Sequence, residues 1–439
     1  MPKIVLVGAG SVEFSRNLIG DLLTFPSLRD STLALVDIDE ERLSAIAALG
    51  RRMAAQEKAN VRIESSVDRR RVLEGADYVI MSIRVGDVEG AVARYRIPHT
   101  YGVDQAVGDT VGPGGVFQFL VNGPAVLDIL MDVERMAPRA WVMQYTNPMG
   151  MSCLLAHMAT RTRHVGLCHS VQGIPARLAG YIGVPRDEVR CWVAGINHMA
   201  WVLRFEWKGK DAYPLLREAM ARPEIYARDP VRFEVMRHFG YFVTESSGHM
   251  SEYVPYFRRT PELIRQYGLS SADGLEERAA RWAARRRAQR EEIRRLAQSD
   301  EPIPIERTRE YCGFIIDAIE RDQPFAFNGN VRNTGLIPNL PHDCVVEVLC
   351  VAQGTGIHPC HVGDLPAELA ALNRSNLAVQ ELAVRGLLNR DREAVHRAVQ
   401  LDPLTSSVLA LPRIRQMVDE MFAAFAPDLV FQTSKEPKP

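Results

Sequence analysis

A glycine-containing turn and an aspartate near the N-terminus have the residue types and spacing of a dinucleotide-binding site. The turn consists of Gly8, Ala9, Gly10 and Ser11 and follows a short apolar run. Its glycines allow a sharp turn and let backbone N–H groups approach a pyrophosphate, whose charge the following helix N-terminus favours. Asp37 ends the next apolar run and can accept hydrogen bonds from a ribose 2′-OH, which favours NAD over NADP. A glutamate replaces the usual third glycine, so the motif is incomplete.

Three further polar residues, Arg84, Asn147 and Cys168, come just after apolar runs that we predict to be strands. The carboxyl ends of strands form the edge at which open α/β sheets bind ligands. We therefore expect Arg84 and Asn147 to contact a sugar or a cofactor, with a turn or surface role as the alternative. By residue type alone, Cys168 is a buried core thiol and His198 a polar residue with satisfied hydrogen bonds.

Alternating strand and helix patterns surround these residues. A helical pattern follows the glycine turn, and a second one covers 40–57. The alternation predicts an α/β fold with a doubly wound parallel sheet. The predicted strands are 3–7, 32–36, 78–83, 141–145 and 164–167, with a short apolar segment at 61–63.

At 439 residues the chain exceeds the size at which one hydrophobic core usually keeps growing, so we expect two domains. The pattern changes near Arg190 to mixed short strands and long helices. We predict a dinucleotide-binding Rossmann domain at 1–190 and an α+β substrate and catalytic domain at 191–439. The segment 274–298 is rich in Arg, Glu and Ala and predicts a solvated helix with i,i+4 ion pairs, and 434–439 predicts a disordered tail.

The composition argues for a small-molecule partner. The formal net charge is −1, which gives no electrostatic footprint for nucleic acid or an anionic membrane. No apolar stretch is expected to reach the roughly 18 residues of a membrane span. The seven cysteines are scattered, without CxxC pairs, so we expect free thiols in a reducing cytoplasm.

Several separated motifs together resemble glycoside hydrolase family 4, over nearly the whole chain. Cys168, His169 and Ser170 are similar to the α-galactosidase branch, whereas branches that act on 6-phosphosugars carry Asp or Asn at the position of His169. The motifs are GDT at 108–110, GPGG at 112–115, YTNP at 145–148, CHSV at 168–171, GINH at 195–198 and NTGLIPNLP at 333–341.

This resemblance implies an N-terminal Rossmann domain and a second α+β domain, similar to lactate and malate dehydrogenases. It implies NAD, a divalent cation such as Mn²⁺, and a homodimer or homotetramer. The implied reaction oxidises C3 of the sugar by hydride transfer to NAD⁺, removes the acidified C2 proton, eliminates the aglycone, adds water and reduces C3 again. NAD is regenerated in every turnover.

The resemblance also implies roles for individual residues. Cys168 and His198 match the metal ligands, which leave coordination positions for sugar oxygens and water. Tyr253 matches the general base, and a nearby cation can lower the pKa of its phenol. Tyr256, three residues on, is the rival for that role.

The general acid has two candidates. His169 can protonate a leaving oxygen near neutral pH, or it can only hydrogen-bond a galactose hydroxyl. Asp109 is a second candidate, or a substrate ligand. A metal-binding thiolate at Cys168 would also be open to oxidation in air.

Three alternative functions stay open from the sequence. An α-galacturonidase or α-glucuronidase of the same family would need a cation facing the C6 carboxylate, for which Arg84, Arg258 and Arg332 are available. A 2-hydroxy acid dehydrogenase would produce NADH and would not require Cys168. A non-catalytic NAD-binding module would keep the fold without the chemistry.

Overall fold

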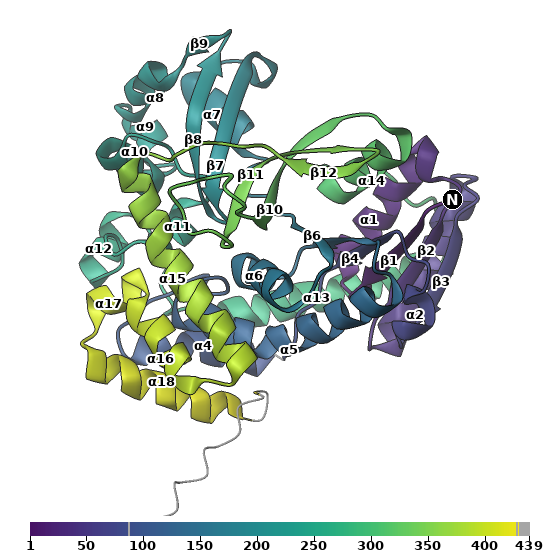
Figure 1. Cartoon of the computed structure of the whole chain (residues 1–439), viewed down its shortest axis with the longest axis horizontal. Coiled ribbons are helices and arrows are strands. Elements are labelled where there is room, and N and C mark those ends of the chain that lie inside the picture. Colours follow the sequence, from purple (N-terminus) through teal and green to yellow (C-terminus); the bar gives the residue numbers. More distant parts are fainter. Residues whose placement is uncertain (87, 427–428, 430–439) are drawn as a thin grey trace, which may run out of the picture.

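A computed structural model describes residues 1–86, 88–426 and 429, and Figure 1 shows its arrangement. The N-terminal half contains a parallel sheet in the order β3-β2-β1-β4-β5-β6, which confirms the predicted doubly wound α/β fold. The observed strands differ from the predicted ones by a few residues at their ends. They are β1 (Lys3–Val7), β2 (Thr32–Val36), β3 (Arg62–Ser66), β4 (Tyr78–Met81), β5 (Trp141–Gln144) and β6 (Arg163–Gly166).

Helices cover both faces of this sheet, which explains why its central strands are almost continuously apolar. In β1, Ile4 and Leu6 belong to one hydrophobic core, whereas Val5 and Val7 belong to another on the opposite face. The helices of this half are α1 (Val12–Thr24), α2 (Glu40–Gln56), α3 (Arg70–Leu73), α4 (Val88–Thr100), α5 (Gly112–Met136), α6 (Met149–Ala159) and α7 (Ile174–Ile182), with short 3₁₀ turns at Pro26–Leu28 and Arg186–Glu188.

Helix α5 corrects one prediction. It is the single helix of the described residues that is long and apolar enough to cross a membrane, although the sequence was expected to contain no such stretch. Glycines, a proline and an asparagine interrupt its apolar runs, but its mean hydropathy over 18 residues is 1.4. In the structure, 72% of that window is buried inside the protein, as in a core helix.

The remaining strands extend the same sheet. β6 bridges to β10 at Gly166 and Asn330, and β11 bridges to β7 at Glu347 and Gly195, so the sheet continues as β6-β10-β11-β7-β8-β9. These antiparallel strands are β7 (Val189–Ile196), β8 (Met199–Trp207), β9 (Lys210–Asp211), β10 (Phe325–Arg332), β11 (Val345–Gln353) and β12 (Gly356–Pro359), the last paired with β11.

Helices of the C-terminal half return to pack on the N-terminal half. α15 contacts α5 and α6, and α18 contacts α4 (Figure 1). The helices are α8 (Tyr213–Met220), α9 (Pro223–Tyr226), α10 (Pro230–Phe239), α11 (Ser247–Tyr253), α12 (Pro261–Gln266), α13 (Leu275–Gln298), α14 (Tyr311–Arg321), α15 (Ala367–Asn389), α16 (Arg392–Leu401), α17 (Pro403–Val408) and α18 (Leu411–Phe425).

Helix α13 is the segment predicted to be a solvated helix, and it is only partly so. The expected i,i+4 ion pair is present between Glu277 and Arg281, at 3.5 Å. However, α13 packs against α1, α2 and α4, and Ile293 and Leu296 are buried. The predicted tail at 434–439 lies outside the described residues.

Candidate active site

The glycine turn and Asp37 meet at the end of β1. Gly8 has φ +92°, and a Cβ there would lie 2.1 Å from the Ser82 carbonyl oxygen, so only glycine fits. The Gly10 N–H donates to Asp37 Oδ2 at 2.7 Å. Ser11 occupies the N-cap of α1, but its side chain makes no capping bond, which leaves the first N–H groups of α1 available to an anion.

A second group of predicted residues meets where β6 and β7 end. His198 lies in the two-residue turn between β7 and β8 with φ +64° and is buried. Its Nδ1 lies 3.2 Å from the Tyr253 hydroxyl, and its Nε2 lies 3.6 Å from Glu245 Oε2. The Cys168 side chain hydrogen-bonds His198, so the two predicted metal ligands are in contact.

Cys168 and His198 shift each other's pKa in the direction of a thiolate and an imidazolium. Burial alone would raise the pKa of Cys168, but the charge of His198 and the hydrogen bond to it lower that pKa below the usual value. Burial lowers the pKa of His198, but the negative charge of Cys168, the hydrogen bond to it and the charges of Glu245 and Asp109 together raise that pKa. A thiolate beside an imidazole is a donor set that suits a divalent metal.

Sequence reasoning missed two members of this group. The ligand atoms of His198, Glu245 and His249 all lie within 4.8 Å of one another, which is the geometry of a possible metal site. A signal was present, because Glu245, His249 and Tyr253 recur at every fourth position. In the structure His249 and Tyr253 share one face of α11, and Glu245 lies just before the helix. The two buried imidazoles and the half-buried carboxylate of Glu245 offer ligand atoms that suit a divalent ion, and His198 links this set to Cys168.

The structure separates the two tyrosines. The Tyr253 hydroxyl lies 2.9 Å from Thr110 Oγ1, and the ring is buried. Burial raises the pKa of Tyr253 well above its usual value, so a base at this position needs a neighbouring positive charge. Tyr256 is 43% exposed and packs its ring on Phe239, away from His198.

Asp109, Asn147 and Arg84 lie around the same centre. Asn147 hydrogen-bonds the Asp109 carboxyl, while Asp109 Oδ1 is buried and has no partner among the described residues. Burial raises the pKa of Asp109, against the charges of His198 and Arg84. An acceptor oxygen that is buried without a partner is suited to a ligand hydroxyl.

His169 lies at the rim of this group. Its side chain is 56% exposed, and its Nε2 lies 2.8 Å and 2.9 Å from the two carboxyl oxygens of Glu310. This hydrogen bond raises the pKa of His169, so the ring carries a proton at higher pH than a free histidine does. Glu310 was not predicted, because it is far from His169 in the sequence.

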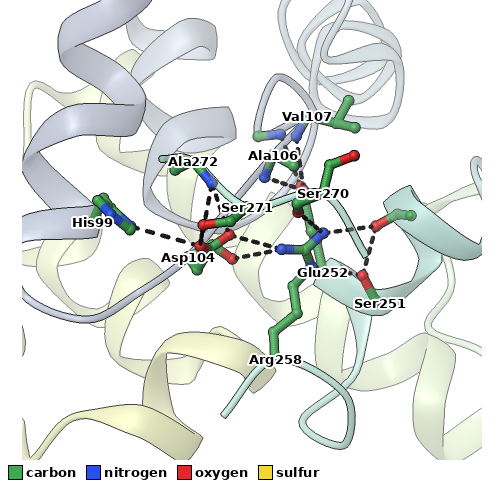
Figure 2. A network of polar contacts seen from close by, with 12 residues as sticks. His99, Asp104, Ala106, Val107, Ser251, Glu252, Arg258, Ser270, Ser271 and Ala272 are labelled. Carbon is green, nitrogen blue, oxygen red and sulfur yellow. Dashed lines mark hydrogen bonds and ion pairs between the residues drawn. The ribbon is translucent and has the colours of Figure 1, made fainter. Parts of the chain in front are cut away.

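A network of buried charges holds the loop that carries Asp109 and Thr110 (Figure 2). Glu252, adjacent to Tyr253, accepts the N–H groups of three consecutive residues, 106–108, at 2.7, 2.8 and 2.8 Å. Arg258 pairs with Asp104 at 2.8 Å and donates to Ser251 Oγ at 2.6 Å. The helix that carries Tyr253 and the loop that carries Thr110 are therefore joined directly.

Sequence comparison identifies relatives over the whole length of the chain. The model of the family 4 glycosyl hydrolases matches residues 3–184, and that of the family 4 glycosyl hydrolase C-terminal domain matches 193–405. An α-galactosidase of Bacillus subtilis is 41% identical over 97% of this chain and 98% of its own. An α-galactosidase of Rhizobium meliloti is 34% identical over 97% and 88%, and an α-galacturonidase of Lachnoclostridium phytofermentans is 26% identical over 96% and 95%.

Solved structures share the fold. A Bacillus subtilis protein described as a glucosidase superposes with a TM-score of 0.85, at 25% identity over 96% of this chain and 99% of its own. A 6-phospho-α-glucosidase from gut microorganisms, in complex with NAD and Mn²⁺, gives 0.81 at 17% identity over 98% and 100%. Malate dehydrogenase of Plasmodium falciparum gives 0.54 at 14% identity over 89% and 99%, which confirms the dehydrogenase-like fold. The chain belongs to glycoside hydrolase family 4.

Proposed function

We propose that this chain hydrolyses α-galactosides by transient oxidation at C3, with NAD and a divalent metal such as Mn²⁺. The observation that carries the proposal is the cluster of the half-buried Cys168 with the buried His198 and Tyr253, which come from three different elements. The substrate class follows the α-galactosidase that is 41% identical over nearly the full length.

Cys168 and His198 would hold the metal, with Glu245 and His249 beside them. When bound, NAD accepts and returns the C3 hydride, and the metal polarises the sugar oxygens. Tyr253 would take the C2 proton. Its hydroxyl is already oriented by Thr110 at 2.9 Å and His198 at 3.2 Å, and the cluster can supply the positive charge that its raised pKa requires.

The remaining roles follow from position. His169, whose pKa is raised by its hydrogen bond to Glu310, would donate a proton to the leaving oxygen, or would bind a galactose hydroxyl. Asp109 is the second candidate acid or a substrate ligand, with Asn147 and Arg84 as sugar or cofactor contacts. Gly8, Gly10, Ser11 and Asp37 would bind NAD.

The packing of two arginines favours a galactoside over a uronide. Arg258 is fully buried in its pair with Asp104, and Arg332 pairs with Asp343 at 2.7 Å. Of these three arginines, Arg84 alone has no carboxylate pair within the described part of the chain, and its guanidinium lies over the ring of Trp282. A uronide carboxylate would have to rely on Arg84.

We further propose that 1–190 forms the dinucleotide-binding part and 191–439 the substrate and catalytic part. The free state of all seven cysteines supports a reducing, cytoplasmic location. The family resemblance supports a homodimer or homotetramer, which size-exclusion chromatography with light scattering would test.

The experiment that tests the function is hydrolysis of p-nitrophenyl α-galactoside with NAD⁺, Mn²⁺ and a thiol, each omitted in turn. We expect release that needs both NAD⁺ and the metal, without accumulation of NADH. Preference for the α-galacturonide or α-glucuronide in parallel assays would instead assign the uronide branch. Steady NADH production from a hydroxy acid, without release, would make the protein a dehydrogenase and would refute the proposal.

A further inference from the structure

One face of α13 carries a tryptophan and three arginines at every fourth position, namely Trp282, Arg286, Arg290 and Arg294. Residues four apart lie above one another on a helix, so these side chains form one row about three turns long. The row is distant in sequence from the glycine turn, but α13 packs on α1, α2 and α4, the helices that frame it.

The first end of the row reaches the loop after β4. The Arg84 guanidinium carbon lies 5.0 Å from the centre of the Trp282 ring, and that of Arg286 lies 4.3 Å from the same centre. Arg84 also acts electrostatically on Asp109 in the catalytic cluster. This end of the row therefore lies next to Arg84, which is close enough to Asp109 to act on its charge.

The other end of the row reaches the glycine turn. A small hollow, open to solvent, lies between the turn, α2 and α13. Arg42, Arg290 and Arg294 line it together with Ala9 and Gly10, and its remaining lining is apolar. Gly10 donates its N–H to Asp37, so the hollow adjoins the carboxylate that we propose for the ribose.

The positive charges along this row are not all balanced. Arg42 pairs with Asp39 at 2.7 Å and Arg294 with Glu41 at 2.6 Å. In the described part of the chain, neither Arg286 nor Arg290 has a carboxylate partner, although both are only half-exposed. Burial and the neighbouring arginines lower the pKa of both groups, and the charge of Asp39 offsets only part of this lowering at Arg290. Uncompensated like charges at a concave surface are what an anion-binding site requires.

We propose that Arg286 and Arg290 of α13 bind phosphate oxygens of the dinucleotide and so form a cationic wall opposite the glycine turn. The inference rests on the proposed function and extends it, because it places binding residues in the C-terminal half. The phosphate is either the diphosphate, which NAD and NADP share, or the 2′-phosphate of NADP. Arginine suits either one, because its planar fork can form two parallel hydrogen bonds to phosphate.

The test is calorimetric titration of the full chain with NAD⁺ and with NADP⁺, without sugar. Arg290→Gln and Arg286→Gln are compared with Arg287→Gln, an exposed neighbour that points away from the row. We expect each row variant to weaken binding roughly tenfold or more, as for the loss of a charge-assisted hydrogen bond, and the control to bind as the wild type does.

Equal weakening for both dinucleotides would assign the diphosphate, and weakening for NADP⁺ alone would assign the 2′-phosphate. Unchanged affinity of folded row variants for both ligands would overturn the inference and leave the proposed function standing. A wild-type chain that binds neither dinucleotide would overturn both. Circular dichroism of each variant shows that it is folded, and the partial exposure of both arginines makes misfolding an unexpected cause.

Discussion

The glycine turn and the cluster around His198 are assembled from different kinds of contact. At the turn, backbone groups make the contacts: the N–H groups of Gly8 and Ala9 donate to the Val36 carbonyl oxygen, and the Gly10 N–H donates to the Asp37 carboxylate. At the cluster, side chains contact side chains, and their residues span 109–253. The turn therefore depends on the shape of the backbone, whereas the cluster depends on the chemistry of each side chain, and substitutions should affect the two regions differently.

The largest expected effect is in the cluster. Tyr253→Phe removes the proposed base and should lower kcat about 10² to 10⁴-fold, while NAD⁺ affinity stays unchanged. Steady-state assays with p-nitrophenyl α-galactoside measure it. Tyr256→Phe is the matched control and should retain activity, because that ring is exposed and packs on Phe239. Equal losses in both variants would contradict the assignment.

Cys168→Ser should lower activity about 10² to 10³-fold. The substitution removes a proposed metal ligand, and the metal contributes several kcal/mol of charge stabilisation in the transition state. The variant should also bind less Mn²⁺ by equilibrium dialysis. The wild type should lose activity in air and recover it with thiol and Mn²⁺, whereas the residual activity of the variant should not change in air. Cys360→Ser changes a half-exposed thiol and serves as the control. Full activity and metal content in Cys168→Ser would remove the thiol from the site.

Glu252→Gln tests whether the cluster depends on its supporting loop. An amide offers one acceptor oxygen, so at least one of the three N–H donors at 106–108 would lose its acceptor, at a cost of about 1 to 3 kcal/mol. We expect kcat to fall roughly 10 to 100-fold with little change in KM. Glu262→Gln, on the exposed side of α12, is the control. A change in thermal stability without any change in kcat would give Glu252 a purely structural role.

Gly10→Ala perturbs the turn alone. The added Cβ would lie 2.7 Å from Asp37 Oδ2, so the turn must shift and NAD⁺ affinity should fall roughly tenfold. Saturating NAD⁺ should restore most of kcat, because the sugar side is untouched. A loss of kcat that NAD⁺ cannot rescue would show that the two regions are not independent.

The smallest effect concerns pH and a histidine outside both regions. His164 on β6 is buried. Burial is the larger cause, and the charge of the neighbouring His157 the smaller one, that lowers its pKa well below 6.5. Below about pH 6.5, the unfolded chain therefore binds a proton at His164 that the folded chain does not bind. The free energy of unfolding is unaffected above that pH and falls by roughly 1.4 kcal/mol per pH unit below it. Thermal melts at pH 7 and pH 5 should show less pH dependence for His164→Leu than for the wild type. An identical dependence would exclude His164 as the cause.

The same comparison explains what could be predicted from the sequence. Strands and the glycine turn were found because apolar runs and glycines are local signals. Glu310 and the contact of Glu252 with 106–108 could not be found, because they depend on how distant elements pack. The Arg-rich segment was interpreted as a solvated helix because its composition shows charge but not the surface that α13 covers. Glu245 and His249 did have a local signal, because they precede Tyr253 by eight and four positions, but the sequence prediction did not include them.

The turn between β7 and β8 places stability and activity in opposition at one residue. His198 has φ +64°, a left-handed conformation that costs a residue with a Cβ of order 1 kcal/mol and that glycine or asparagine adopts more easily. Selection for heat resistance alone would therefore favour replacing the imidazole. A thermostable descendant that has lost catalysis would be expected to carry its change here, so His198 is a position to hold fixed when the protein is engineered for stability.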